Sequence, residues 1–195
     1  MKLTPQLLLN AYCQGIFPMA EDDGTLYWYD PDPRAVLPLD SFHVPRSLRR
    51  RANRQDYEIK INSAFREVMV QCAAPDVGRE STWISEELID VYTQIHHMGY
   101  AHSVETWMQG QLVGGLYGVA IGGFFAGESM YSRISGGSKL ALVGLVASLK
   151  SQGFLLLDVQ FITDHLRQFG VQEISKSKYH AELAKALAIE TQFVA

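Results

Sequence analysis

An acidic and an amide side chain stand two positions apart inside an apolar run of the chain. Residues 155–161 read LLLDVQF and carry Asp158 and Gln160. Successive side chains of a β-strand point to opposite faces, so these two would share one face. Because a buried carboxylate without a partner is costly, that face either opens onto solvent or a cleft, or local partners satisfy both groups. The chemistry available in a cleft would be that of carboxylates and backbone groups.

No other motif of catalysis or metal binding accompanies this pair. The sequence has no Walker A motif, no GxSxG and no GxGxxG between a strand and a helix. Adjacent His96 and His97 would point about 100° apart on a helix and make poor joint ligands. Cys13 and Cys72 form no CxxC, which argues against a zinc site or a disulfide framework. We therefore expect no metal.

A short basic segment stands out against a formal net charge of −4. Residues 43–54, HVPRSLRRRANR, hold five arginines and no acid. On a helix, Arg46, Arg50 and Arg54 would line one face, which suits contact with the phosphates of a nucleic acid. A solvated helix face explains the same pattern.

Length and composition indicate one compact globular unit. The chain has 195 residues, of which 47% are hydrophobic and 19% charged. No run approaches the roughly 20 apolar residues of a membrane span, and the first residues lack the pattern of a secretion signal. We expect a cytoplasmic protein that does not bind membranes.

The apolar periodicity and the turn residues predict an α+β order with a mixed sheet. Helices are expected at 5–14, 62–73, 85–99, 138–153, 163–170 and 178–189. Strands are expected at 26–29, 35–39, 57–61 and 154–161, at 171–174, and as an antiparallel meander over 101–132. We expect a small N-terminal helix and strand subdomain, residues 1–56, packed on a catalytic domain, residues 57–195.

This order resembles the GNAT-type acyltransferase fold. In that fold the strands before and after the central helix splay apart around an acyl donor. The resemblance implies that Glu128 on one strand and Asp158 with Gln160 on the other face a common cleft. The segment RISGGS, residues 133–138, partly resembles the loop that holds coenzyme A pyrophosphate at a helix start. A coenzyme A-dependent N-acetyltransferase is thus an alternative reading, and a non-catalytic RNA-binding module is a third.

A more specific resemblance covers nearly the whole chain. It rests on seven ordered segments: AYCQGIFPM, LYWYDPDPRAVLPL, FHVPRSL, TWISEELIDVYTQIHHMGYAHSVETW, LVGGLYGVAIGGFFAGESMYSR, SKLAL and LLDVQF. Together they resemble the leucyl/phenylalanyl-tRNA protein transferase family. Membership would imply transfer of Leu, Phe or Met from aminoacyl-tRNA to the N-terminal Arg or Lys of acceptor proteins, which marks them for degradation by the N-degron route. It also implies no cofactor, and we expect a monomer.

The same resemblance assigns roles to individual residues. Glu128, Asp158 and Gln160 fall on its catalytic positions. We expect Asp158 to hold the acceptor amine, Gln160 to orient Asp158 or the tetrahedral oxygen, and Glu128 to supply negative charge toward the acceptor; the roles of the two acids could be exchanged. Met19 stands where the family has Trp. The expected substrate-binding positions are Trp83, Tyr12 and Tyr92 near the terminal adenosine, and Leu116, Phe125 and Met130 in the pocket for the amino-acid side chain. For the last three, ordinary core packing is the alternative. The expected tRNA-binding positions are Arg46, Arg50 and Arg54.

Overall fold

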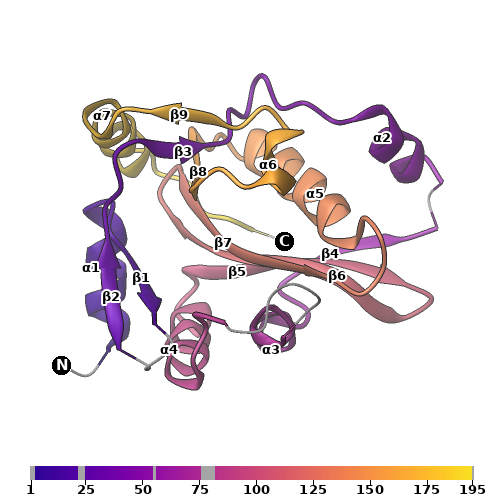
Figure 1. The fold of residues 1–195 in the computed structure, drawn as a ribbon, viewed down its shortest axis with the longest axis horizontal. Helices are drawn as coiled ribbons and strands as arrows, with labels where there is room; N and C mark the ends of the chain where they lie inside the picture. Colours follow the sequence, from indigo (N-terminus) through magenta and orange to yellow (C-terminus); the bar gives the residue numbers. More distant parts are fainter. Residues whose placement is uncertain (1–2, 22–24, 55, 76–81, 195) are drawn as a thin grey trace.

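The computed structural model describes residues 3–21, 25–54, 56–75 and 82–194 and is built around one seven-stranded sheet (Figure 1). The strand order is β4-β5-β6-β7-β8-β3-β9, in which β7 and β8 are parallel and the other neighbouring pairs are antiparallel. The strands are β3 (Arg34–Val36), β4 (Glu58–Ile61), β5 (Ala101–Met108), β6 (Gln111–Ile121), β7 (Phe124–Ser132), β8 (Leu156–Gln160) and β9 (Gln172–Ile174). The predicted mixed sheet is therefore confirmed.

Helices cover both faces of the sheet (Figure 1). They are α1 (Pro5–Cys13), α2 (Arg46–Ala52), α3 (Phe65–Ala73), α4 (Glu86–His97), α5 (Gly137–Ser151), α6 (Asp164–Arg167) and α7 (Lys176–Leu187). Helix α5 lies against one face, and α3 with α4 lies against the other. Each face has its own apolar cluster, so the sheet separates two halves of the core. No helix of the described residues has the length and apolarity needed to cross a membrane.

Local sequence signals explain where several helices begin. The Thr4 hydroxyl accepts a hydrogen bond from the Leu7 amide at the start of α1, and the Ser85 hydroxyl does the same for the Leu88 amide in α4. Such caps satisfy amide groups that have no partner inside the helix. Helix α5 has no side-chain cap, and its first turn follows Gly136 at φ 87°. Glycine adopts this left-handed conformation without steric cost.

The strands β7 and β8 separate soon after they begin. They pair only from Phe124 with Leu156 to Ala126 with Asp158. Beyond that point β7 continues beside β6 as far as Ser132, while β8 ends at Gln160. Among the described residues, the second half of β7 therefore pairs with a strand on one side only, which leaves a splayed opening between β7 and β8.

The N-terminal segment differs in two ways from its prediction. A strand that was not predicted, β1 (Phe17–Ala20), pairs antiparallel with β2 (Leu26–Tyr29) in a separate two-stranded sheet. Strand β3 also lies inside the main sheet, between β8 and β9, although its residues belong to the predicted N-terminal subdomain. The main sheet is consequently built from both ends of the chain.

Candidate functional site

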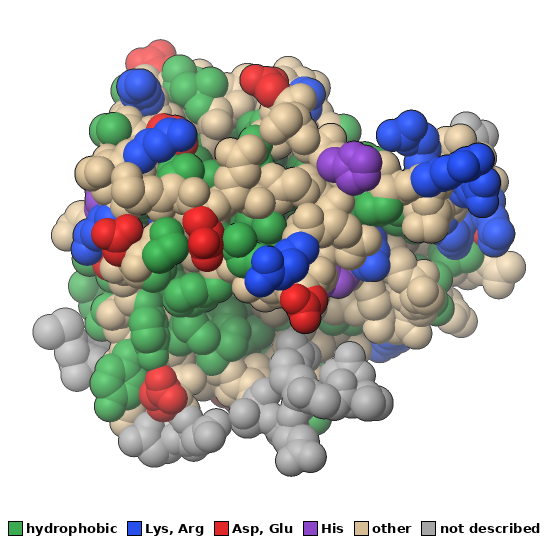
Figure 2. Space-filling model, turned by 45° about the horizontal axis from the view of Figure 1, so that its top comes forward, with side chains coloured by type: hydrophobic (Ala, Val, Ile, Leu, Met, Phe, Trp, Pro, Cys, Tyr) green, Lys and Arg blue, Asp and Glu red, His purple; other side chains and the backbone are tan. Residues whose placement is uncertain are grey.

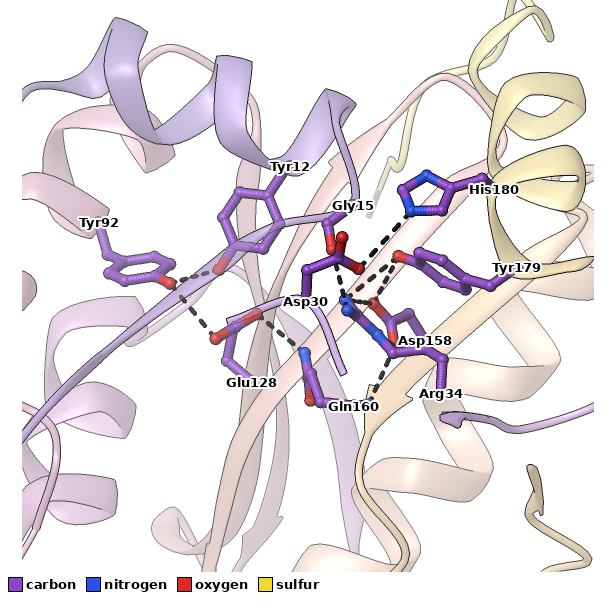
Figure 3. A network of polar contacts seen from close by, with 10 residues as sticks. All are labelled: Tyr12, Gly15, Asp30, Arg34, Tyr92, Glu128, Asp158, Gln160, Tyr179 and His180. Carbon is purple, nitrogen blue, oxygen red and sulfur yellow. Dashed lines mark hydrogen bonds and ion pairs between the residues drawn. The ribbon is translucent and has the colours of Figure 1, made fainter. Parts of the chain in front are cut away.

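Glu128 lies on β7 just beyond the point where β8 separates from it. Its Oε1 accepts a hydrogen bond of 3.2 Å from the Gln160 side-chain amide, and its Oε2 accepts one of 3.3 Å from the Tyr92 hydroxyl (Figure 3). Burial raises the pKa of Glu128 to about 8; the Tyr12 hydrogen bond opposes this shift, and the charge of Asp158 adds to it. A carboxyl group with this pKa can both release and accept a proton near neutral pH.

Two buried tyrosines support Glu128 from the helices α1 and α4. The hydroxyl groups of Tyr12 and Tyr92 share a short hydrogen bond, and both side chains are almost completely buried. Burial and the nearby charge of Glu128 raise the pKa of both tyrosines well above its ordinary value, so both hydroxyls stay protonated. The structure therefore brings Tyr12 and Tyr92, two of the predicted substrate-binding residues, together at Glu128.

Asp158 is enclosed by partners. Its carboxylate accepts hydrogen bonds from Arg34 Nε at 2.9 Å and Arg34 Nη2 at 2.6 Å, from the Tyr179 hydroxyl at 2.9 Å, and from the Gln160 backbone amide at 2.9 Å. Arg34 also donates to the Gly15 carbonyl at 2.9 Å. The exposed fractions of Arg34 and Asp158 are 1% and 0%, so this is a fully buried ion pair.

The expectation that Asp158 and Gln160 face one cleft together is wrong. Asp158 points toward Arg34 and Tyr179, whereas the Gln160 side chain points toward Glu128 (Figure 3). The cause is the backbone of Gln160, which lies at φ 59° in the left-handed region and so ends the regular alternation of the strand. The Asp158 carboxylate holds that conformation by accepting from the Gln160 amide.

A cavity of about 640 Å³ opens where β7 and β8 part, and we call it the splay cavity. One side is apolar and is formed largely by β6, α5 and β8. Glu128 and Gln160 lie in its wall together with the consecutive β7 residues that follow Glu128. Its lining residues are Gln71, Ala74, Pro75, Leu116, Tyr117, Gly127, Glu128, Ser129, Met130, Tyr131, Ser132, Ser138, Leu142, Leu145, Leu157, Val159, Gln160, Thr163, His165 and Leu166.

Three polar atoms in the wall of the splay cavity have no hydrogen-bond partner among the described residues. They are the hydroxyls of Tyr117 and Tyr131 and Nε2 of His165, and each is shielded from solvent. Burial raises the pKa of both tyrosines and, assisted by the charge of Lys139, lowers that of His165, so all three groups are neutral. Buried polar atoms without partners are uncommon and costly, so their gathering here is typical of a ligand site.

The predicted pocket residues divide into those that line the cavity and those that do not. Leu116 and Met130 line it on the side of α5. Phe125 is fully buried in the core behind them. Trp83 is half-buried and packs, like Met19, against the core cluster that contains Tyr12 and Tyr92. Neither Trp83 nor Met19 belongs to the cavity wall.

The predicted arginine stripe is only partly helical. Arg46 and Arg50 lie on α2, but the helix ends at Ala52 and Arg54 follows outside it, so the prediction of one shared helix face is wrong for Arg54. Arg46, Arg50 and Arg54, which we call the arginine cluster, are all exposed. Basic side chains gather at the edge of the molecule where α2 lies (Figure 2). A shallow hollow beside them is lined by His43, Val44, Arg46, Arg49, Arg50 and Asn53.

Two serines that flank the loop before α5 bond to each other. The amide of Ser138 donates to the Ser132 hydroxyl at 2.8 Å, and the two hydroxyls are 2.9 Å apart. An amide that would face a phosphate at a coenzyme A site is therefore already bonded. Within residues 3–21, 25–54, 56–75 and 82–194, no group of three or more His, Cys, Asp or Glu side chains could hold a metal ion.

Sequence reasoning missed the two residues that enclose Asp158. Arg34 begins β3 and Tyr179 lies on α7, at sequence distances of 124 and 21 residues from Asp158. The signal available for Arg34 was a charged residue directly before the apolar run AVLPL. A buried arginine needs an acidic partner, but its sequence does not say which one.

Comparison with known proteins identifies the relatives of the chain. The family model for leucyl/phenylalanyl-tRNA protein transferase matches residues 36–184, and the model for the N-terminal domain of the same family matches residues 1–32. The leucyl/phenylalanyl-tRNA--protein transferase of Herpetosiphon aurantiacus is 54% identical over 193 residues, which are 98% of each chain. That of Gloeobacter violaceus is 50% identical over 192 residues, 98% of this chain and 97% of the relative. Among solved structures, the chain is similar to L-PGS from Bacillus licheniformis, with a TM-score of 0.49 and 18% sequence identity. The matched part is 82% of this chain and 60% of the L-PGS chain.

Proposed function

The chain belongs to the leucyl/phenylalanyl-tRNA protein transferase family, and we propose that it transfers Leu, Phe or Met from aminoacyl-tRNA to the N-terminal Arg or Lys of acceptor proteins. It is an aminoacyltransferase, as its relatives are. The product would be a protein extended by one residue and marked for the N-degron route. Because aminoacyl-tRNA is the proposed donor, we place the reaction in the cytoplasm.

The contact between Glu128 and Gln160 across the splayed strands carries this proposal. It sets a carboxyl group of raised pKa beside an amide in the wall of a cavity with an apolar side. An aminoacyl ester is already activated, so the protein has to position an amine near the ester carbonyl and remove its proton. Glu128 and Gln160 supply the groups for both tasks.

The proposed reaction is aminolysis of the ester. The neutral α-amino nitrogen attacks the carbonyl carbon, a C–N bond forms, and the C–O bond to the ribose breaks. The proton released by the amine passes to Glu128 and then to the ribose oxygen that leaves. The pKa of an α-amino group is about 8, close to that of Glu128, so proton exchange between them costs little free energy.

We assign Asp158 to positioning and Glu128 to the amine, which is the exchanged version of the roles first expected. All four hydrogen bonds to Asp158 come from protein groups, so the acceptor amine would have to displace Arg34 or Tyr179 to reach it. Glu128, in contrast, lies in the cavity wall. Gln160 would orient Glu128 and the tetrahedral oxygen.

The donor would lie with its amino-acid side chain against the apolar wall and its adenosine toward α1 and α4. Leu116 and Met130 would contact that side chain, with Phe125 supporting them from behind. We assign Trp83, Tyr12 and Tyr92 to the terminal adenosine and the arginine cluster to tRNA phosphates. Stacking on an aromatic ring is worth roughly 1 to 3 kcal/mol per base, and phosphate contacts need cations.

We further propose that the fold is GNAT-like. The splay of two parallel strands beside a central helix supports this reading. The acetyltransferase alternative is not favoured, because the Ser138 amide is bonded to Ser132 and no Lys or Arg of the described residues lines the cavity. A pyrophosphate would find no cation among the described lining residues, and the Ser138 amide would not be free to donate to it.

Labelled leucyl-tRNA incubated with a peptide that begins with Arg tests the proposal. Label should enter that peptide and not a matched peptide that begins with Ala. Glu128→Gln should lower the rate about 100-fold or more, in the range of general acid–base catalysis. Glu173→Gln, which changes an exposed glutamate of β9, is the matched control. Equal labelling of both peptides, or full activity of Glu128→Gln, would contradict the proposal.

A further inference from the structure

The wall of the splay cavity contains an unbroken run of β7. Residues 127–132 all line the cavity, six in succession. Side chains alternate between the faces of a strand, so a cavity that met one face only would touch every second residue. The cavity therefore meets the edge of β7, on the side where β8 has left.

The register of β6 and β7 shows which main-chain groups point to this edge. The Arg133 amide donates to the Val113 carbonyl at 2.9 Å, and the register continues through Gly114 opposite Ser132 and Leu116 opposite Met130. Hydrogen-bonded and non-hydrogen-bonded pairs alternate in an antiparallel ladder. Met130 and Ser132 are thus in non-hydrogen-bonded pairs, and their N–H and C=O groups point away from β6 toward the cavity.

These groups have no other main-chain partner in the described part of the chain. The pairing of β7 with β8 stops at Ala126, and the remaining backbone hydrogen bonds do not involve Met130 or Ser132. An open edge with alternating donors and acceptors is the feature that binds extended peptides by strand addition. Its position inside a cavity keeps it away from other sheet edges.

The charge of the cavity wall decides between the two substrates. A nucleic-acid end brings phosphates, which require cations, but no Lys or Arg of the described residues lines the cavity, and its polar lining includes the neutral side chains of Gln71, Tyr131, Ser132 and Ser138. A polypeptide main chain brings neutral amides and carbonyls that match a strand edge. The edge therefore fits the acceptor better than the donor.

We propose that the N-terminal segment of the acceptor polypeptide binds as an added parallel strand on the open edge of β7, in the place that β8 vacates. This inference rests on the proposed function, because it fixes the acceptor α-amino group at Glu128. From there the acceptor would run in the direction of β7 toward Ser132. Four residues of strand span about 13 Å, so the acceptor would be in contact over roughly its first four residues.

Acceptor peptides of graded length test the inference. With labelled leucyl-tRNA as the donor, kcat/KM for the acceptor should rise from Arg-Ala to a peptide of about four residues and then stay constant. N-methylation of single peptide amides should lower kcat/KM about two- to tenfold at every second position and leave the intervening positions unaffected, because only alternate amides of a strand face its neighbour. Equal values for all lengths, or an equal loss at every methylated position, would overturn the inference. Absence of transfer to any unmethylated peptide would instead refute the proposed function.

A matched pair of variants tests the same edge from the side of the protein. Ser132→Pro removes the amide that points into the cavity, whereas Ser132→Ala loses the hydroxyl and keeps that amide. The gain in kcat/KM with acceptor length should shrink in the proline variant and persist in the alanine variant, while the KM for leucyl-tRNA stays the same in both. A length dependence that is identical in the two variants would contradict the inference. A raised donor KM with an unchanged acceptor KM would assign the edge to the tRNA end and would also overturn it.

Discussion

Replacing Asp158 by Asn separates positioning from catalysis at the buried ion pair. The substitution keeps the size of the side chain but leaves the Arg34 charge without a partner in a site where both side chains are at most 1% exposed. Burial lowers the pKa of Arg34, yet its hydrogen bond to Asp158 and the charge of Asp158 outweigh this effect and leave that pKa raised. A guanidinium stays protonated in proteins, so Arg34 will stay charged in the variant even without the Asp158 carboxylate. Breaking a buried pair on one side costs about 3 to 5 kcal/mol, because the remaining charge stays desolvated.

The expected loss is large enough to measure by thermal unfolding. For a chain of about this size 1 kcal/mol shifts Tm by about 2 to 4 °C, so Asp158→Asn should lower Tm by roughly 6 to 20 °C. Tyr179→Phe is the graded control, because it removes one of four hydrogen bonds to Asp158 and keeps the carboxylate; it should cost about 1 to 3 kcal/mol. The rate of a single turnover per folded molecule should also fall in Asp158→Asn, since Gln160 loses the carboxylate that fixes its backbone.

Melting temperature and single-turnover rate should be measured on the same samples, well below the Tm of the variant. An unchanged Tm in Asp158→Asn would refute the prediction that the variant leaves Arg34 buried and charged without an acidic partner. Full activity per folded molecule would show that Gln160 holds its position without Asp158. A native Tm combined with lost activity, partly recovered as pH rises, would restore the first expectation that Asp158 itself takes the amine proton.

Three further predictions address the other groups of the site. The pKa of Glu128 rises from 4.5 to about 8 on folding, so the folded state favours the protonated carboxyl. The stability of the wild type should therefore fall relative to that of Glu128→Gln as pH increases between these two values. A Tm difference between the two proteins that is the same at pH 5 and pH 9 would argue against the shift. Changing the three residues of the arginine cluster to Gln should reduce the salt dependence of tRNA affinity by roughly one to three ion equivalents. Transfer from a minimal aminoacyl-adenosine should stay almost unchanged. An unaltered salt dependence would mean that the cluster is only a solvated surface. Trp83→Ala should weaken a puromycin-like inhibitor about tenfold or more, and Met19→Ala should weaken it less; the reverse order would mean that Met19 forms the main adenine wall.

Most elements of the fold were predictable because their signals are local. Thr4 and Ser85 cap the helices that follow them, and apolar periodicity predicted both of these helices. The meander over 101–132 alternates with turn glycines and forms β5 to β7. β1 was missed because Pro18 and the surrounding turn residues hide a strand that exists only through its pairing with β2. A strand of four residues has little signal of its own when its partner supplies the stabilisation.

The candidate site was predictable in its residue types and in part of its geometry. The sequence pointed to Glu128 and Gln160, and the structure places them in contact. It also paired Asp158 with Gln160 on one face, because a regular strand alternates. The left-handed backbone at Gln160 breaks that alternation. The residue type of Gln160 does not predict this conformation, because the conformation depends on the Asp158 carboxylate, which Arg34 and Tyr179 hold in place.

The sequence by itself determined the family, the order of helices and strands, and the identity of the polar groups available for chemistry. Only the tertiary structure decided that Asp158 is bonded by buried protein groups and that Glu128 lines the cavity. Arg34 reaches Asp158 across 124 residues of chain because β3 pairs with β8, and this contact gives one carboxylate a buried protein partner. The parting of β7 from β8 exposes the other carboxylate, Glu128, together with the strand edge beside it. Local preferences set each strand, but burial and pairing between distant strands set the environment of each charge.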